Sequence, residues 1–178
     1  MVFHCVIERM VLLEVRQMAT AFLIHQGSVL MMKKEKSKIF NFEFWGGIGG
    51  HMESNEINSP MVASYREIEE ETGFKKDEIK NFRLKYILLE KNSGEIRQQY
   101  VYIGETKHMN FIPSDEGELF WVPKNEILDL YTSKIINLTI EHYLNNKNSD
   151  DIFVGAMMTN NESKSEIQWS AIKETVGF

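Results

Sequence analysis

Alternating apolar and polar positions dominate the first two-thirds of the chain and predict a fold rich in strands. Turn-forming residues at Gln26–Gly27, Asn92–Glu95 and Asn160–Ser165 separate pairs of such stretches and predict three β-hairpins. One shorter stretch ends in proline and predicts a further strand. The expected strands are Met18–His25, Ser28–Lys34, Phe82–Lys91, Ile96–Glu105, Glu118–Pro123, Asp151–Met158 and Glu166–Ser170.

A helical period appears between the first two hairpins. Ser59 suits the N-cap, Pro60 suits the first helical position, and Gly73 suits the residue after the last turn. Apolar residues at helical spacing predict the face that packs into the core. These residues are Met61, Val62, Tyr65 and Ile68.

Three other stretches complete the pattern. Residues 124–130 and 133–144 have helical spacing, whereas the glycines in 45–56 predict irregular backbone rather than a regular element. Strands first, with one helix between hairpins and further helices later, predict an α+β fold with a mixed sheet. The last hairpin is expected to add to or cover this fold, with Trp169 as its apolar anchor.

Composition narrows the class of protein. The chain has 178 residues and a hydrophobic fraction of 43%, which suits one globular domain. Its net charge of −6 argues against a nucleic-acid polymer as partner, but a bound cation would still allow a small phosphate-bearing substrate. A single cysteine, Cys5, indicates a reducing cytoplasm. No apolar run predicts a membrane span, and Met1–Gln17 lacks signal-peptide features.

The helix carries an unusual density of glutamates in the sequence REIEEETG, residues 66–73. At about 100° per residue, Glu67, Glu70 and Glu71 share one face, whereas Glu69 lies about 160° from Glu67. Such a face is either a solvated surface or a set of carboxylates that share a divalent cation. Arg66 can also offset the repulsion by pairing with Glu70.

This stretch and the glycines before it resemble the Nudix box. The matching residues are Gly50, Glu56, Arg66, Glu67, Ile68, Glu70, Glu71, Gly73 and Phe74. The gap between Glu56 and Arg66 is two residues longer than in the family pattern. Alignment on Pro60 places the extra residues before the helix, so the register of the helix is intact.

The resemblance implies an α/β/α sandwich around the mixed sheet. It divides the chain into an N-terminal extension at 1–17, a Nudix domain at 18–147, and a C-terminal hairpin at 148–178 that packs on the same domain. We expect a chain that starts at Met18 to fold and stay active, and the resemblance leaves a homodimer open.

The resemblance also implies metal-dependent hydrolysis of a nucleoside diphosphate linked to another moiety, with Mg²⁺ as cofactor and Mn²⁺ as a substitute. Glu70 and Glu71 would be the main metal ligands. Glu67 would be a further ligand or would orient the attacking water, with Arg66 holding it. Glu56 would be an outer ligand.

Further residues near the box receive implied roles. A Gly49 or Gly50 carbonyl would coordinate the metal, and His51 beside them would contact phosphate. The family often recruits one more glutamate from a distant loop, and Glu116 and Glu118 are the candidates, in that order.

Substrate choice is less defined by the sequence. Proline and tyrosine markers of two other subgroups of the family are missing, which favours a MutT-like enzyme acting on a nucleoside triphosphate, including an oxidised one. The alternatives are an inactive Nudix binding or regulatory module and a structural protein with a Glu-rich helix. For the tryptophans Trp45, Trp121 and Trp169, core or rim packing is the first interpretation and base stacking the second.

Overall fold

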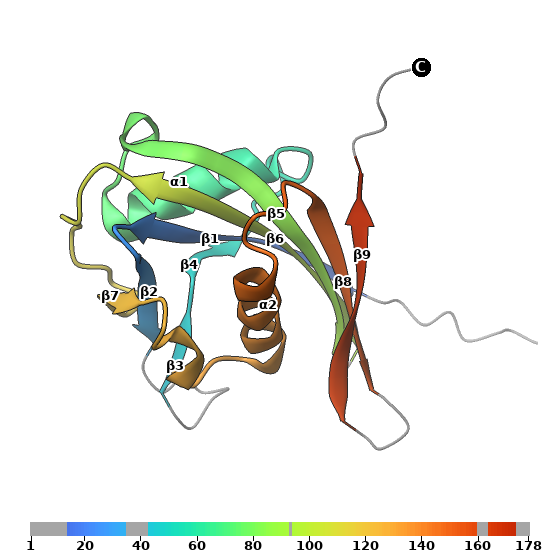
Figure 1. Cartoon of the computed structure of the whole chain (residues 1–178). Helices are drawn as coiled ribbons and strands as arrows, with labels where there is room; N and C mark the ends of the chain where they lie inside the picture. Colours follow the sequence, from blue (N-terminus) through green and yellow to red (C-terminus); the bar gives the residue numbers. More distant parts are fainter. Residues whose placement is uncertain (1–13, 35–42, 93, 160–163, 174–178) are drawn as a thin grey trace, which may run out of the picture.

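The structure, a computed structural model, describes residues 14–34, 43–92, 94–159 and 164–173 (Figure 1). These residues form nine strands, two α-helices and two short 3-10 helices. In chain order the elements are β1 (Glu14–His25), β2 (Ser28–Lys34), β3 (Phe44–Gly46), β4 (Ile48–His51), α1 (Pro60–Thr72), η1 (Lys76–Glu78), β5 (Ile79–Asn92), β6 (Glu95–Thr106), β7 (Glu118–Pro123), η2 (Ile127–Asp129), α2 (Lys134–Asn145), β8 (Ile152–Thr159) and β9 (Ser165–Ile172).

Three antiparallel pairs correspond to the three expected hairpins: β1 with β2, β5 with β6, and β8 with β9. The first turn places Gln26 and Gly27 at positive φ, as tight hairpin turns require, and Gly94 provides the same geometry in the second. The expected hairpins are therefore confirmed, although part of the third turn lies outside the described residues.

Two parallel pairings make the sheet mixed. β1 pairs with β6 from Glu14 opposite Glu95 to Ile24 opposite Glu105, and β5 pairs with β8. The strands follow the order β3-β2-β1-β6-β5-β8-β9, with β4 on β1 and β7 on β2. The expected mixed α+β sheet is confirmed.

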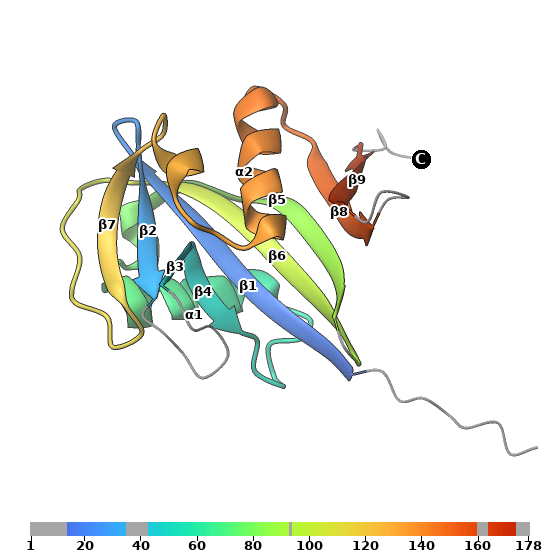
Figure 2. The ribbon, with the colours of Figure 1, turned by 90° about the horizontal axis from the view of Figure 1, so that it is seen from below.

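The two helices cover opposite faces of this sheet, which gives the α/β/α sandwich (Figures 1 and 2). Alternation along β1 shows the two layers, because Leu23 packs with Ile68 of α1, whereas Phe22 packs with Ile136 of α2. No helix in the described ranges is long and apolar enough to cross a membrane.

Some boundaries differ from the sequence prediction. β1 begins at Glu14, four residues before Met18, because its pairing with β6 extends the strand. The first 13 residues, with Cys5, lie outside the described part of the chain, and the domain boundary at Gln17 stays a prediction. In 124–130 only a short 3-10 helix forms.

The glycine-rich stretch is also more regular than expected. Gly49 and Gly50 belong to β4, which pairs with β1. Irregular backbone was wrong for these residues because the edge of β1 supplies hydrogen-bonding partners to them.

Helix α1 has the expected ends but a different buried face. Ser59 precedes it, Pro60 starts it, and Gly73 follows it with φ 76°. Met61 and Val62, predicted to pack into the core, are exposed. The helix instead buries Ala63, Ser64, Glu67, Ile68, Glu71 and Thr72. Ile68 is buried and Tyr65 packs against the core, as predicted. The prediction was wrong for Met61 and Val62, because two glutamates occupy inward positions, where they interact with Arg66 and the Gly49 amide.

The tryptophans lie at the rim of the core, as the first interpretation expected. Trp45 is half-buried beside Phe120, and the Trp121 indole donates a hydrogen bond to the Met109 carbonyl. Trp169 packs on α2.

Candidate functional site

The carboxylate face of α1 lies against β4 because that strand offers glycines. A Cβ at Gly50 would lie 2.9 Å from both carboxylate oxygens of Glu67, so a larger residue there would displace that carboxylate. Gly49 has φ 144°, and a Cβ there would lie 2.1 Å from the Ala19 carbonyl oxygen. These two positions allow the helix to bring its carboxylates directly over the strand.

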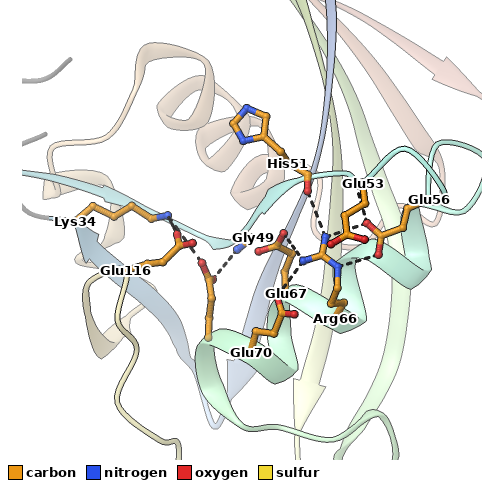
Figure 3. Close-up of polar contacts among 10 residues, drawn as sticks. Lys34, Gly49, His51, Glu53, Glu56, Arg66, Glu67, Glu70 and Glu116 are labelled. Carbon is orange, nitrogen blue, oxygen red and sulfur yellow. Dashed lines mark hydrogen bonds and ion pairs between the residues drawn. The ribbon is translucent and has the colours of Figure 1, made fainter. Parts of the chain in front are cut away.

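Arg66 connects two carboxylates of α1, those of Glu67 and Glu70, to the carboxylate of Glu56 before the helix (Figure 3). Its Nε and Nη2 donate to the two oxygens of Glu56 at 2.8 and 2.9 Å. Its Nη1 donates to Glu67 and Glu70, each at 2.9 Å, and Nη2 also reaches the His51 carbonyl oxygen. The hydrogen bonds from Arg66 lower the pKa of Glu56, and those to Glu56 and Glu67 raise the pKa of Arg66. Arg66 therefore holds these three carboxylates together through hydrogen bonds and ion pairs.

The two extra residues of the box do not displace Glu56. Its side chain is buried, and the Glu53 amide donates to its Oε2. The Ser59 amide in turn donates to the Glu56 carbonyl oxygen, which closes a turn just before the helix. The longer gap is thus absorbed between Glu56 and α1.

A second group surrounds Glu71, the most deeply buried carboxylate of the helix face. The Gly49 amide donates to Glu71 Oε2 at 2.8 Å, but Oε1 is buried without a hydrogen-bond partner. The Lys34 ammonium, from β2, lies 3.9 Å from that Oε1 and 2.7 Å from Glu116 Oε2 (Figure 3). Lys34 thereby bridges a helix carboxylate and a loop carboxylate.

The pKa values of these groups show where the surroundings disfavour the negative charge of a carboxylate. Burial raises the pKa of Glu71 well above its ordinary value, and Glu116 nearby raises it further, against the lowering effects of Lys34 and the Gly49 amide. Burial also raises the pKa of Glu67, which Arg66 opposes. Glu116 behaves in the opposite way, because its hydrogen bond from Lys34 lowers its pKa. The protein thus holds carboxylates in an environment that favours an added positive charge.

Not every expected residue belongs to this group. Glu118 is exposed on β7, where it pairs across the strands with Lys33 rather than pointing to the helix. The His51 side chain is exposed, and only its carbonyl contacts Arg66. Conversely, Lys34 was missed by the sequence analysis. Strand alternation could have found it, because it lies in phase with Leu30 and Met32, which pack on the α1 face.

A cleft of about 240 Å³ lies between the sheet and the start of α2, and it meets the carboxylate group at Lys34 and Gly49. Its floor is the sheet, including Thr20, Leu88 and Gln99. Its walls come from β3 on one side and from the first turn of α2 on the other. The Gln99 amide donates to the Thr20 hydroxyl at 2.7 Å, which fixes two polar groups on the floor.

The donor set fits a hard divalent cation. As the described side chains stand, no three His, Cys, Asp or Glu residues converge into a ready metal site, since Arg66 and Lys34 engage most of the carboxylates. However, the buried, unpartnered Oε1 of Glu71 needs a positive partner, and carboxylate oxygens are the ligands that Mg²⁺ and Mn²⁺ prefer. Carboxylates grouped this closely can hold a divalent cation, and a cation held there would polarise a phosphate.

The comparisons with known proteins agree with this geometry. The sequence model of the family described as NUDIX domain matches residues 15–141. A mutator MutT protein from Bacillus halodurans superposes with a TM-score of 0.66 at 22% identity, covering 86% of this chain and 97% of that one. A MutT protein from Methanosarcina mazei Go1 gives a TM-score of 0.63 at 20% identity, covering 77% and 98%. A NUDIX hydrolase from Nitrosomonas europaea gives 0.60 at 17% identity, covering 75% and 72%.

Proposed function

The chain belongs to the NUDIX family as a Nudix hydrolase, and on this premise we propose that its substrate is a nucleoside triphosphate, including one with an oxidised base, and its cofactor Mg²⁺. Enzymes of this family hydrolyse nucleoside diphosphates that are linked to another moiety. In the proposed reaction, water attacks a phosphorus atom of the triphosphate and the anhydride bond breaks, which releases a nucleoside monophosphate and pyrophosphate.

One observation carries this proposal: Glu71 Oε1 is buried without a hydrogen-bond donor, close to the carboxylate of Glu116. An unpartnered carboxylate oxygen in low dielectric destabilises the protein unless a cation or proton joins it. Lys34 at 3.9 Å is too far to hydrogen-bond with that oxygen. A metal–nucleotide complex bound in the cleft, which shares Lys34 and Gly49 with this group, would supply the missing charge.

The proposed ligands are Glu67, Glu70 and Glu71, with Glu56 as an outer ligand and a carbonyl of Gly49 or Gly50. When bound, the metal supplies neutralisation of the diphosphate charge and activation of water. The chain's own residues prepare this chemistry. Arg66 aligns Glu67 and Glu70 by donating to both from one nitrogen, and burial keeps Glu67 basic enough to orient or deprotonate a water.

Among the two distant glutamates, we propose Glu116 as the assisting residue. It shares Lys34 with Glu71, whereas Glu118 faces solvent on β7. Glu116→Gln and Glu118→Gln are therefore a matched pair. We expect Glu116→Gln to lower kcat by about tenfold or more and Glu118→Gln to leave it unchanged within about twofold. The reverse ranking would reassign the role to Glu118.

The cleft supports the nucleotide part of the proposal. Trp45 and Phe44 on its β3 wall offer aromatic surface to a base, while Lys34 at the carboxylate end offers charge to the phosphates. The inactive binding module remains the second candidate, but every box glutamate is present and Arg66 orders three carboxylates, which a module that only binds would not need.

The experiment is a panel of nucleoside triphosphates, including oxidised ones, with pyrophosphate release as readout. We expect turnover of at least one member with Mg²⁺, none in excess chelator, and recovery with Mg²⁺ or Mn²⁺. Full turnover in excess chelator would overturn the metal dependence. Tight nucleotide binding with no turnover of any member would favour the binding module instead.

A further inference from the structure

The last hairpin lies beyond the family match, which ends at residue 141, and it packs behind one wall of the cleft. Helix α2 lies between β3 and β4 on one side and the β8–β9 hairpin on the other (Figure 1). The first turn of α2 lines the cleft with Ile135 and Ile136, preceded by Ser133. The hairpin therefore supports the element that forms the cleft wall.

The contact between the hairpin and α2 is made by aromatic rings. Trp169 of β9 lies over His142, in the last turn of α2, with ring centroids 4.2 Å apart and planes tilted by 31°. Tyr86 of β5 packs edge-on against Trp169, and its hydroxyl is hydrogen-bonded to His142 Nδ1 at 3.1 Å. Phe153 of β8 closes the cluster against His142. Trp169 of β9 is thus in ring contact with both α2 and β5.

A single row across three strands leads from the cleft to this tryptophan. Leu88 on the cleft floor pairs with Gly155, and Gly155 pairs with Trp169. A Cβ on Gly155 would lie 2.5 Å from Trp169 Cζ3, so the ring occupies the space above the glycine. Because these three residues are neighbours on one face of the sheet, the position of Trp169 is tied to the cleft floor as well as to the wall.

The link between α2 and β8 is fixed separately. Lys85 of β5 is buried, and its ammonium donates hydrogen bonds to the carbonyl oxygens of Ser149 and Asp151 in that link. The same ammonium lies 5.0 Å from the centroid of the Phe153 ring. These contacts hold the connecting segment, so removal of the Trp169 ring alone leaves the hairpin attached through Lys85 and the β5–β8 ladder.

We propose that the β8–β9 hairpin is a positioning element for the substrate cleft and that Trp169 is its positioning residue, an inference that rests on the proposed nucleotide function. A helix is stiff and rises about 1.5 Å per residue, so His142 and Ser133 are about 14 Å apart along α2. A shift where Trp169 holds His142 therefore tilts the end of the helix that lines the cleft. The proposed metal-binding carboxylates of α1 are held on the opposite face of the sheet from α2, so a tilt of α2 leaves them in place.

This arrangement predicts that loss of the Trp169 ring weakens nucleotide binding and leaves the turnover rate nearly unchanged. Trp169→Ala should raise KM for the nucleotide by about tenfold and change kcat by less than about twofold, because it disturbs a wall and not the carboxylates. Trp169→Phe should recover most of the wild-type KM, because a smaller ring still contacts His142. Gln168→Ala is the matched control, since Gln168 is exposed on the same strand, and it should leave both constants unchanged.

Two further measurements distinguish positioning from general stability. Amide hydrogen exchange at residues 135–138 should accelerate in Trp169→Ala and not in Gln168→Ala. Calorimetric binding of a non-hydrolysable triphosphate analogue should weaken by the same factor as KM rises. A lower Tm with unchanged KM and unchanged exchange would overturn the proposal, because Trp169 would then act only on stability.

The binding measurement also separates this inference from the proposed function. If wild type binds the analogue but hydrolyses no nucleotide, hydrolysis of a triphosphate fails while the effect of Trp169 on binding still decides the inference. If wild type neither binds nor hydrolyses any nucleotide, the proposed function fails and the inference falls with it. If wild type binds the analogue and hydrolyses a nucleotide, and Trp169→Ala does so with the same affinity and KM, only the inference about Trp169 is overturned.

Discussion

The two helices pack on opposite faces of one sheet, yet they bury different chemistry. Helix α1 buries Glu67 and Glu71 next to small residues, whereas α2 buries Ile135, Ile136 and Ile140. Burying carboxylates costs free energy that burying isoleucines would have contributed. The α1 face therefore carries buried charge at the expense of stability, as the proposed metal site would need, and the α2 face supplies stability and shape.

The largest test of this contrast concerns the four glutamates of α1. We expect Glu70→Gln and Glu71→Gln to lower turnover by at least about 100-fold, and Glu67→Gln to be severe as well, because each faces the proposed metal site. Glu69 instead pairs with Lys75 at the surface, and Glu69→Gln should stay within about twofold of wild type. Turnover rates, with circular dichroism as a control for folding, decide this. Equal damage from Glu69→Gln and Glu70→Gln would contradict the assignment of the helix faces.

The next test removes the guanidinium of Arg66, which compensates the charge of buried carboxylates at the α1 face. Arg66→Ala leaves the buried carboxylates of Glu56 and Glu67 without their partner, which should cost about 3 kcal/mol of unfolding free energy and most of the activity. Denaturant unfolding at neutral pH measures the first effect. Arg66→Lys restores the positive charge, so it should recover part of the stability. It should recover little of the activity, because a lysine ammonium cannot contact three carboxylates as the planar guanidinium of arginine does.

The corresponding test on α2 should separate stability from chemistry. Ile140 of α2 is buried in the core and is not among the residues that line the cleft, so Ile140→Ala should cost about 3 kcal/mol through lost packing and a new cavity. Its kcat, per folded molecule, should stay within about twofold of wild type. If kcat instead fell as far as in the Glu71 variant, the two faces would not differ as we infer.

The smallest expected effect is a pH dependence on the α2 side. Burial lowers the pKa of His142 below its ordinary 6.5, and the charge of Lys85 lowers it further. The groups that face this imidazole are the Tyr86 hydroxyl and the rings of Phe153 and Trp169. The unfolded chain therefore binds the proton more readily, so the stabilising contribution of neutral His142 is complete above about pH 6.5 and is lost as pH falls towards the folded pKa.

Comparison with His142→Gln isolates this effect from the carboxylates of the site. The difference in unfolding free energy between wild type and His142→Gln should be larger at about pH 7.5 than at about pH 5.5. A difference that stays constant, or grows on acidification, would contradict the lowered pKa.

Local signals in the sequence predicted the local structure. The ends of α1 follow from Ser59, Pro60 and Gly73, whose preferences act within a single turn, and the hairpins follow from turn residues such as Gly27 and Gly94. The sharing of a face by Glu67, Glu70 and Glu71 also needs only the helical period, although it does not predict that Glu67 and Glu71 are buried and Glu70 exposed.

The remaining features depend on contacts between distant residues. Lys34 and Glu116 are 82 positions apart, so their ion pair has no local signature. Met61 and Val62 were wrongly assigned to the inward face of α1, because charge compensation by Arg66 and the glycines of β4 outweigh hydrophobicity there. The parallel pairing of β1 with β6 was not predicted either, because period-two alternation identifies a strand but not its neighbour.

That pairing has a consequence for how the protein is made. β1 lies in the middle of the sheet, but its parallel partner β6 begins 81 residues later at Glu95. Closing a loop of that length costs about 4 kcal/mol of chain entropy before the contact is gained. During synthesis, β1, β2 and α1 therefore emerge from the ribosome with the β6-facing edge of β1 open, and that edge is closed only after Thr106 has left the exit tunnel. Nascent chains that stop before β6 are the ones that chaperones must protect from edge-to-edge aggregation.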